Sequence, residues 1–308
     1  MPAQVRVFAP GSVGNVGPGF DILGLAVGGL GDHVRAERVQ KTGIVVAEPG
    51  HPALPTDPAR HTSAIAASHV LRKAGARFGL VLKVAKGLPL AGGQGGSAAS
   101  AVAGALAANL LLDSPLATTQ VLEAALEAEA VVAGRHADNV VAILLGGLVL
   151  VRTLEPLEVV RLPVPPELYV VLAHPDQRMP TRTGRAVLPA MIPREDAVYQ
   201  AAQVAALVAA AHSGDLALLG RSIEDRIAEP VRAPLLTGFK EAKHAALDAG
   251  ALGCSISGSG PTAFALVRDR VSGDRVAAAM QAAYQAAGLS CSTRVALPDL
   301  EGARAVES

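Results

Sequence analysis

A glycine-rich segment at residues 87–100 constrains this chain more than any other stretch. It reads Gly-Leu-Pro-Leu-Ala-Gly-Gly-Gln-Gly-Gly-Ser-Ala-Ala-Ser and leads into an uncharged, apolar run that continues to Leu112. Because the four glycines among residues 92–96 lack Cβ atoms, consecutive backbone N–H groups there can turn toward one point. A helix beginning at Ser97 would direct its free N–H groups and its positive dipole end at the same point. The segment therefore predicts an anion site, for which phosphate is the usual ligand.

The spacing of these glycines matches neither common nucleotide-binding fingerprint. No Lys-Ser or Lys-Thr pair follows the last glycine, as a Walker loop requires, and no Gly-x-Gly-x-x-Gly opens a dinucleotide-binding unit. A flexible turn without a ligand would also account for the glycines alone. The choice between a turn and a phosphate loop therefore depends on the rest of the chain.

Length and composition indicate a compact soluble protein. With 308 residues the chain suits one large or two medium domains, and 50% apolar against 18% charged residues argues against disorder. The net charge is zero, aromatic residues make up 3% and Trp is absent, so nucleic acid and anionic membranes are poor partners. Two cysteines are too few for a disulfide scaffold, and residues 1–10 have no signal-peptide core. We therefore expect a cytoplasmic protein.

The glycine-rich segment carries the first resemblance to a known family. Its pattern Pro-x-x-x-Gly-x-Gly-x-Ser-Ala-Ala resembles the phosphate loop of the GHMP kinases, which include galactokinase, homoserine kinase and mevalonate kinase. Gln94 and Gly96 depart from the family's usual Gly-Leu-Gly-Ser-Ser, whereas the second serine, Ser97, is kept. The resemblance implies that the phosphates of ATP rest on Pro89, Leu90, Ala91, Gly92, Gly93, Gln94, Gly95, Gly96, Ser97 and Ala98.

The segment from Asn15 to Gly24 resembles a motif near the N-terminus of the homoserine kinases. It reads Asn-Val-Gly-Pro-Gly-Phe-Asp-Ile-Leu-Gly, against Asn-Leu-Gly-Pro-Gly-Phe-Asp-x-Leu-Gly in that branch of the GHMP kinases. Glycine and proline predict irregular structure from residue 10 onward, after a short strand at residues 5–9. The resemblance implies that Asn15 and Asp21 contact the substrate, with Asp21 holding its ammonium group.

A buried acid is predicted on the amphipathic helix at residues 117–134. Glu129 falls inside the apolar stripe at 100° per residue, whereas Glu127 lies on the polar face. The stripe consists of Leu122, Ala125, Leu126 and Ala133. A buried carboxylate is costly unless it is paired or bound to a metal, so a structural salt bridge is one explanation. The family resemblance implies another, in which Ser97 and Glu129 are catalytic and bind Mg²⁺.

Three further segments supply polar side chains for a substrate site. His-Ala-Asp-Asn at 136–139 resembles the family's His-x-Asp-Asn, the segment 181–189 resembles its Thr-x-x-x-Arg-x-x-Leu-Pro, and Glu-Pro-Val-Arg at 229–232 resembles its Glu-Pro-x-Arg. Single surface arginines are usually only solvated, but a guanidinium can also bind a carboxylate through two parallel hydrogen bonds. The sequence identifies no general base; Asp138 is the only nearby candidate, and the resemblance implies a reaction that proceeds without one. The resemblance implies substrate contacts from His136, Asn139, Thr181, Arg185 and Arg232.

The order of predicted elements divides the chain into two domains. The first contains strands at 43–48 and 78–84 around a helix at 62–76. The second contains, in order, a strand at 168–173, a helix at 197–211, strands near 253–257 and 263–267, a helix at 273–287 and a strand at 291–297. That β-α-β-β-α-β order is a ferredoxin-like split βαβ, with extra helices inserted between residues 215 and 250.

We therefore expect an α+β protein with the two-domain architecture of the GHMP kinases. Residues 1–152 would form an α/β domain of the ribosomal-protein-S5 type that binds ATP, and residues 153–308 a ferredoxin-like domain that contributes to the substrate site. The segment 49–58 is either a plain connector or a cover for the nucleotide base. The resemblance implies phosphorylation of the L-homoserine side-chain hydroxyl, a step of threonine biosynthesis, with ATP and Mg²⁺ as cofactors.

Two alternatives remain open at the level of the sequence. One is another GHMP kinase, which would act on mevalonate, shikimate or a sugar. The other is a GHMP-fold sensor that binds nucleotide and a partner without turnover. A homodimer is compatible with either of them and with homoserine kinase activity.

Overall fold

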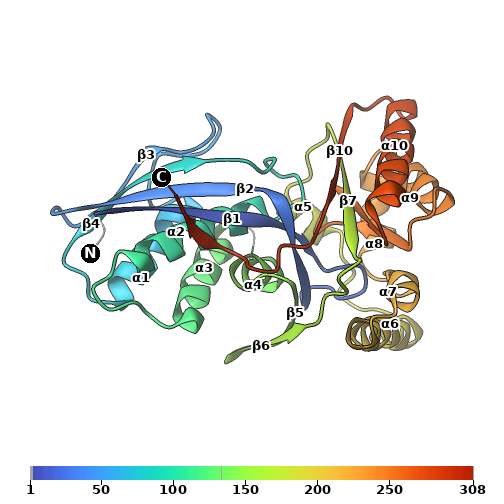
Figure 1. The fold of residues 1–308 in the computed structure, drawn as a ribbon, viewed down its shortest axis with the longest axis horizontal. Coiled ribbons are helices and arrows are strands. Elements are labelled where there is room, and N and C mark those ends of the chain that lie inside the picture. Colours follow the sequence, from blue (N-terminus) through green and yellow to red (C-terminus); the bar gives the residue numbers. More distant parts are fainter. Residues whose placement is uncertain (1–2, 133, 308) are drawn as a thin grey trace.

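The computed structural model describes residues 3–132 and 134–307, and its first layer is a mixed seven-stranded sheet. Five strands follow the order β11-β1-β2-β4-β3, with β5 beside β2 and β6 beside β5 (Figure 1). All pairs are antiparallel except β3 with β4. The strands are β1 (Gln4–Gly14), β2 (Leu23–Val39), β3 (Gly43–Glu48), β4 (Gly79–Ala85), β5 (Leu148–Leu154), β6 (Leu157–Leu162) and β11 (Arg304–Val306).

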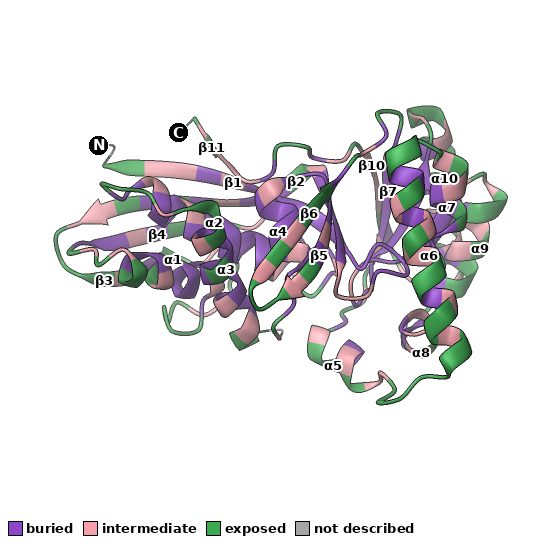
Figure 2. Cartoon of the chain, turned by 90° about the horizontal axis from the view of Figure 1, so that it is seen from below, coloured by how far each residue is buried: buried purple, intermediate pink, exposed green. Residues whose placement is uncertain are grey.

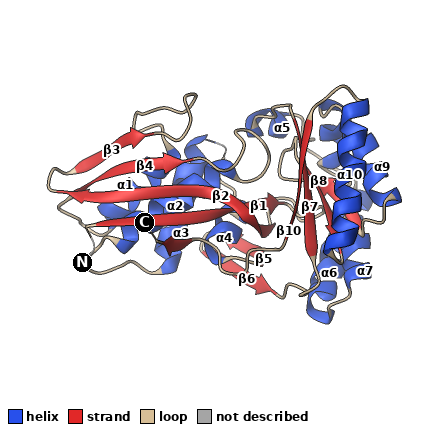
Figure 3. Cartoon of the chain, turned by 45° about the horizontal axis from the view of Figure 1, so that its top comes forward, coloured by secondary structure: helices blue, strands red, loops and turns tan. Residues whose placement is uncertain are grey.

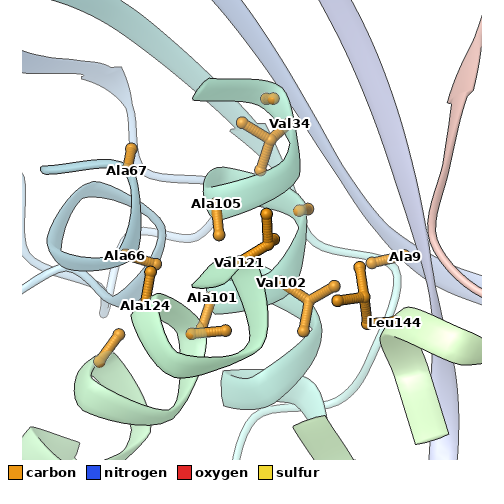
Figure 4. Packing of buried hydrophobic residues seen from close by; sticks show 14 of the residues in the cluster. Ala9, Val34, Ala66, Ala67, Ala101, Val102, Ala105, Val121, Ala124 and Leu144 are labelled. Atoms are coloured by element: carbon orange, nitrogen blue, oxygen red, sulfur yellow. The ribbon is translucent and has the colours of Figure 1, made fainter. Parts of the chain in front are cut away.

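Four helices cover one face of this sheet (Figures 1 and 3), namely α1 (Thr62–Lys73), α2 (Gly96–Leu110), α3 (Thr118–Val132) and α4 (Asp138–Leu145). The central helix α2 is built from small residues, which pack against alanines and valines of its neighbours (Figure 4). A Cβ on Gly104 would lie 2.3 Å from the carbonyl oxygen of Ser63, so α1 approaches α2 at backbone distance. Among the described residues no helix, α2 included, is long and apolar enough to cross a lipid bilayer.

The second layer is an antiparallel four-stranded sheet in the order β10-β7-β9-β8. This is the strand order of the ferredoxin-like split βαβ, as predicted. Its strands are β7 (Tyr169–Pro175), β8 (Gly253–Ile256), β9 (Ala263–Val267) and β10 (Cys291–Ala296). The short elements α5 (Thr181–Ala186), α8 (Glu229–Arg232) and a 3₁₀ turn (Ala233–Leu235) lie between β7 and β8 in the chain.

Helices lie on both faces of the second sheet (Figure 2). Val171 and Ala173 share a core with α9 (Phe239–Asp248) and α10 (Arg270–Ala286). Val170 and Leu172 instead share a core with α6 (Arg194–Ser213), α7 (Leu216–Arg221) and the first sheet. The helix predicted at 197–211 is therefore not the one beside α10, and α9 takes that position. The order of elements alone could not reveal this, because it does not say which face a helix covers.

Strand pairing extends the first sheet beyond residue 152, where we expected the domain boundary. β6 pairs with β5, and β11 pairs with β1, so residues 157–162 and 304–306 belong to the first sheet. Residues 10–14, expected to be irregular, continue β1 after a register shift between Pro10 and Gly11. The expectation failed there because the glycines and proline of these paired strands obscure the alternation of apolar and polar residues.

Candidate functional site

A pocket of about 420 Å³ lies between the two domains. Its walls come from the glycine-rich loop, the turn after β1, the end of α3, the start of α4, α5 and α8. Every predicted site residue lines this pocket except Gln94 and Ala98. Leu54 and Pro55 line it too, so the segment 49–58 reaches the site. The fold thus gathers at one place all the segments that the sequence motifs had singled out.

The backbone of the glycine-rich loop has a form that suits an anion. Gly93 and Gly95 have φ angles of 76° and 70°, in the left-handed region that favours glycine. Helix α2 begins at Gly96, one residue earlier than predicted, and its N-cap makes no side-chain hydrogen bond. The first N–H groups of α2 therefore remain free for a ligand, and the helix dipole favours a negative one.

Glu129 is buried at the edge of this loop, as predicted from the periodicity of α3. It is 7% exposed, and its Oε1 accepts a hydrogen bond of 2.7 Å from the Ser97 hydroxyl. Its Oε2 is buried and has no hydrogen-bond partner, and within residues 3–132 and 134–307 Glu129 forms no ion pair. Desolvation raises its pKa to about 7, against a lowering by the Ser97 hydrogen bond. By contrast, Glu127 is half-buried and pairs with Arg135 at 2.9 Å. Ala133 of the predicted stripe lies outside the described residues.

An unpartnered buried carboxylate oxygen beside a serine hydroxyl suits a hard cation. Such an ion needs oxygen ligands, and in return its charge compensates that of the buried carboxylate. In the part of the chain that the structure describes, no group of three His, Cys, Asp or Glu side chains could hold a metal by itself. A magnesium ion at this place would therefore also need oxygen atoms from a bound substrate, such as the phosphate oxygens of a nucleotide. Ser97 and Glu129 suit a magnesium site whose ligands come partly from the protein and partly from the nucleotide.

The turn between β1 and β2 is held in a strained form by side-chain hydrogen bonds. Asn15 and Asp21 have φ angles of 67° and 61°, which are uncommon for residues with a side chain. Asn15 Oδ1 accepts from the Asp21 N–H at 3.0 Å, and Asn15 Nδ2 donates to the Gly258 carbonyl at 3.2 Å. Asn15 thus links the turn to the hairpin after β8, and it presents the Asp21 carboxylate to the pocket.

Two arginines from the second domain face this carboxylate. Arg185 forms a two-pronged ion pair with Asp21, with one N–H···O distance of 3.0 Å. Arg232 is 2% exposed, and two backbone carbonyls hold it, with Nε 2.8 Å from the Gly184 oxygen and Nη1 2.9 Å from the Gly258 oxygen. Burial, then the Arg185 charge, lower its pKa. In the ligand-free protein Asp21 is therefore the counter-ion of Arg185.

The segment 136–139 lies at the floor of the pocket. Burial and the charge of Arg185 lower the pKa of His136 to about 4, so its imidazole is neutral at pH 7. Burial, then the charge of Asp21, raise the pKa of Asp138 to about 6. Asp138 Oδ2 accepts from the Asn15 N–H at 3.0 Å, and Asn139 Oδ1 accepts from the Ser12 hydroxyl at 2.8 Å. These bonds tie the floor of the pocket to β1.

The structure adds a buried polar cluster that the sequence reasoning missed. Asp32 of β2 and Lys86, which follows β4 and lines the pocket, form an ion pair beside the loop, with side chains 0% and 6% exposed. Lys86 also donates to the Gly96 carbonyl at 2.7 Å and to Ser100 Oγ at 3.1 Å. Asp32 accepts from the backbone N–H groups that open the loop, at 3.2 and 3.3 Å. The signal that could have revealed this cluster was a single acid, Asp32, in the largely apolar first part of β2, residues 23–34.

Comparison with known proteins places the chain in a family. The model described as GHMP kinases N terminal domain matches residues 61–147, and the model described as GHMP kinases C terminal matches residues 206–286. The homoserine kinase of Arabidopsis thaliana is 44% identical over 99% of this chain and 85% of its own length. The crystal structure of homoserine kinase from Cytophaga hutchinsonii is 40% identical, with a TM-score of 0.95 over 99% of this chain and 98% of that one.

More distant GHMP structures share the fold alone. The mevalonate kinase of L. major is 19% identical, with a TM-score of 0.73 over 97% of this chain and 98% of that one. The α+β two-domain fold predicted from the element order is confirmed by these matches and by the two sheets. The chain belongs to the homoserine kinases, a branch of the GHMP kinase family.

Proposed function

We propose that this ATP-dependent small-molecule kinase transfers the γ-phosphoryl group of ATP to the side-chain hydroxyl of L-homoserine. The product would be O-phospho-L-homoserine, a precursor in threonine biosynthesis. One observation carries the proposal: an anion-binding loop and a set of charges complementary to a zwitterion line the same pocket. The substrate hydroxyl would lie between them, where the phosphoryl group can reach it.

The nucleotide side of the pocket is built from the loop at residues 89–98 and from Glu129. The free N–H groups of the loop and of the α2 N-terminus would hold the phosphates. Ser97 and Glu129 would hold Mg²⁺ together with phosphate oxygens, and the ion would neutralise the charge that builds up on them. The orphan Glu129 Oε2 supports this assignment, because a cation there would satisfy it.

The acceptor side of the pocket is charged and can bind an amino acid at both ends. Arg185 and Arg232 would bind the carboxylate of homoserine, since each guanidinium presents parallel donors. Asp21 would bind the ammonium group after exchanging Arg185 for the substrate. His136, Asn139 and Thr181 line the space between these groups, and we propose that they orient the side chain.

Positioning and charge neutralisation would supply most of the catalysis. The hydroxyl oxygen forms a bond to the γ-phosphorus while the bond from that phosphorus to the β,γ-bridging oxygen breaks, and the hydroxyl proton leaves to solvent or to the phosphoryl group. Phosphoryl transfer of this kind needs no strong base, because its transition state is loose. Asp138 also lines the pocket and has no ligand role in this proposal, but its Oδ2 already accepts the Asn15 N–H. We therefore propose that no side chain is required as general base.

The alternatives make different demands on the pocket. A mevalonate, shikimate or sugar kinase has no use for an acid that binds ammonium, and a sensor has no use for the Ser97–Glu129 pair. A coupled assay of ADP release with homoserine, mevalonate, shikimate and galactose tests the proposal. We expect turnover with homoserine only; ATP binding without a phosphorylated product from any acceptor would favour the sensor.

The substrate and the amino-acid composition indicate the cellular compartment and the kind of partner. We propose a cytoplasmic enzyme whose partners are small molecules, without a nucleic-acid or membrane partner, because its net charge is zero. A homodimer remains compatible with this proposal.

A further inference from the structure

The phosphate loop is held, on the side away from the pocket, by a polar cluster of the buried Gln94 and Thr262 and the half-buried His174, which we call the Gln94 cluster. Gln94 Nε2 donates to Thr262 Oγ1 at 3.2 Å, and His174 Nδ1 lies 3.1 Å from the same oxygen. Thr262 Oγ1 in turn lies 2.5 Å from the carbonyl oxygen of Gly92. Gln94 is 5% exposed and does not line the pocket. Its side chain therefore acts on the loop rather than on a ligand.

The hydrogen-bonding capacity of the Thr262 hydroxyl is used completely. A hydroxyl has one proton and two lone pairs, and here the proton goes to the Gly92 carbonyl. Both lone pairs then accept, one from Gln94 Nε2 and one from His174 Nδ1, which must carry a proton. Loss of Gln94 or of His174 would leave one lone pair unused. The proton would then no longer be obliged to point at the Gly92 carbonyl, which the Thr262 N–H also reaches at 3.3 Å. The Gln94 cluster therefore determines in which direction the Thr262 proton points.

Similar donors hold the next two carbonyls of the loop. The Ser257 hydroxyl donates to the Gly93 carbonyl at 2.6 Å, and the Ser12 N–H donates to the Gln94 carbonyl at 3.1 Å. In a planar trans peptide the carbonyl of one residue and the N–H of the next point in opposite directions. The donors that hold the carbonyls of residues 92–94 lie on the outer side of the loop. They therefore fix the N–H groups of residues 93–95 so that these point to the inner side of the loop.

We infer that Gln94 is a positioning residue for the nucleotide, which acts through Thr262 to aim the Gly93 N–H at the phosphates. Gln94 and Gly92 belong to the first domain, whereas His174 of β7 and Thr262 belong to the second. The Gln94 cluster thus also fixes the loop relative to the domain that carries Arg185. It gives a reason for the departure from the family's usual leucine, which could donate no hydrogen bond. The inference rests on the proposed kinase function.

Four variants test this inference in the full-length protein. Gln94→Leu and Thr262→Val each remove one member of the Gln94 cluster at nearly constant volume, whereas Thr262→Ser keeps the hydroxyl. We expect the dissociation constant of a non-hydrolysable ATP analogue, measured by calorimetry, to rise about 5- to 10-fold in the first two. Thr262→Ser should stay within about twofold of wild type, and the fourth variant, Gln94→Leu/Thr262→Val, should bind no more weakly than Thr262→Val alone. The KM for homoserine should change by less than about twofold.

Additive losses in the double variant, or equal losses in Thr262→Ser and Thr262→Val, would overturn the inference. So would an equal rise of the KM values for ATP and homoserine, which would indicate general damage. Thermal unfolding of each variant separates loss of folding from loss of positioning, and Gln94→Leu remains informative if Thr262→Val does not fold. Failure of the proposed function is distinguishable, because then the wild type itself would bind no ATP analogue or phosphorylate no homoserine.

Discussion

The two sides of the pocket offer opposite means of recognition to the ligands that we propose for them. On the nucleotide side the loop offers backbone N–H groups, and the side chain of Lys86, which also lines the pocket, is buried and paired with Asp32. On the acceptor side the charged groups of Arg185, Arg232 and Asp21 face the cavity themselves. A site made of backbone depends on chain conformation and is damaged by a single Cβ. A site made of charged side chains tolerates backbone change but loses its ligand when one charge is removed.

Glu129 is the exception on the nucleotide side, and its substitution should have the largest effect. Glu129→Gln removes the charge that would hold Mg²⁺, and we expect kcat to fall about 100- to 1,000-fold, the usual loss for one electrostatic group in a reaction centre. Asp138→Asn is the matched control, because an amide oxygen can still accept the Asn15 N–H; it should keep activity within about 10-fold. Steady-state kinetics would contradict the assignment if Asp138→Asn lost more kcat than Glu129→Gln.

A single added methyl group should strongly weaken nucleotide binding by the backbone of the loop. Gly93 has a φ of 76°, and a Cβ there would lie 2.6 Å from the Ser257 carbonyl and 2.7 Å from the Gly260 carbonyl. Gly93→Ala should therefore weaken binding of an ATP analogue about 100-fold, given the strain and the collision. At Gly96 the nearest atom would be Lys86 Nζ at 3.4 Å, so Gly96→Ala should stay within about threefold. Calorimetric titrations that gave equal losses would show that the loop adapts.

Removal of one charge on the acceptor side should weaken homoserine binding without changing nucleotide binding. Arg232→Ala should raise the KM for homoserine about 10- to 150-fold, the value of one charge-assisted hydrogen bond. The KM for ATP should barely change. Arg232→Lys, which keeps the charge but not the parallel donors, should fall in between. Kinetics that showed equal losses for the two substrates would mean that Arg232 mainly supports the Gly184 and Gly258 carbonyls.

The smallest expected effect concerns stability against pH in the ligand-free protein. The pKa of Glu129 is raised from 4.5 to about 7, so between these values the native state binds a proton that the unfolded state has released. The contribution of Glu129 to the free energy of unfolding must then fall as pH rises, by about 1 kcal/mol between pH 6 and 8, whereas His136, whose pKa is lowered, contributes with the opposite sign. Asp138 contributes with the same sign as Glu129, so urea unfolding of wild type is compared with Glu129→Gln, in which the fall should be smaller. An identical pH dependence in the two proteins would contradict a buried neutral Glu129.

The sequence predicted best those features that local chemistry determines. Glu129 was located because 3.6-residue periodicity needs only its own helix, and the loop glycines because positive φ is a local requirement. Asp32 and Lys86 were missed because the two residues are 54 positions apart and nothing near either one names its partner. The helix beside α10 was misassigned for a related reason, since α6 and α9 both precede β8 in the chain. In both cases the sequence did not determine which distant segments pack against each other.

The position of β11 has a consequence for how the polypeptide must assemble. The chain leaves the first sheet after β6, meets β2 again in a single bridge between Pro298 and Val27, and pairs with β1 at residues 304–306 (Figure 2). In topological terms the second domain is an insertion within the first. A nascent chain that has emerged from the ribosome as far as Ala296 would hold an unshielded strand edge at β1, open to pairing with other chains. Truncation before Arg304 should accordingly promote aggregation rather than release an independent domain.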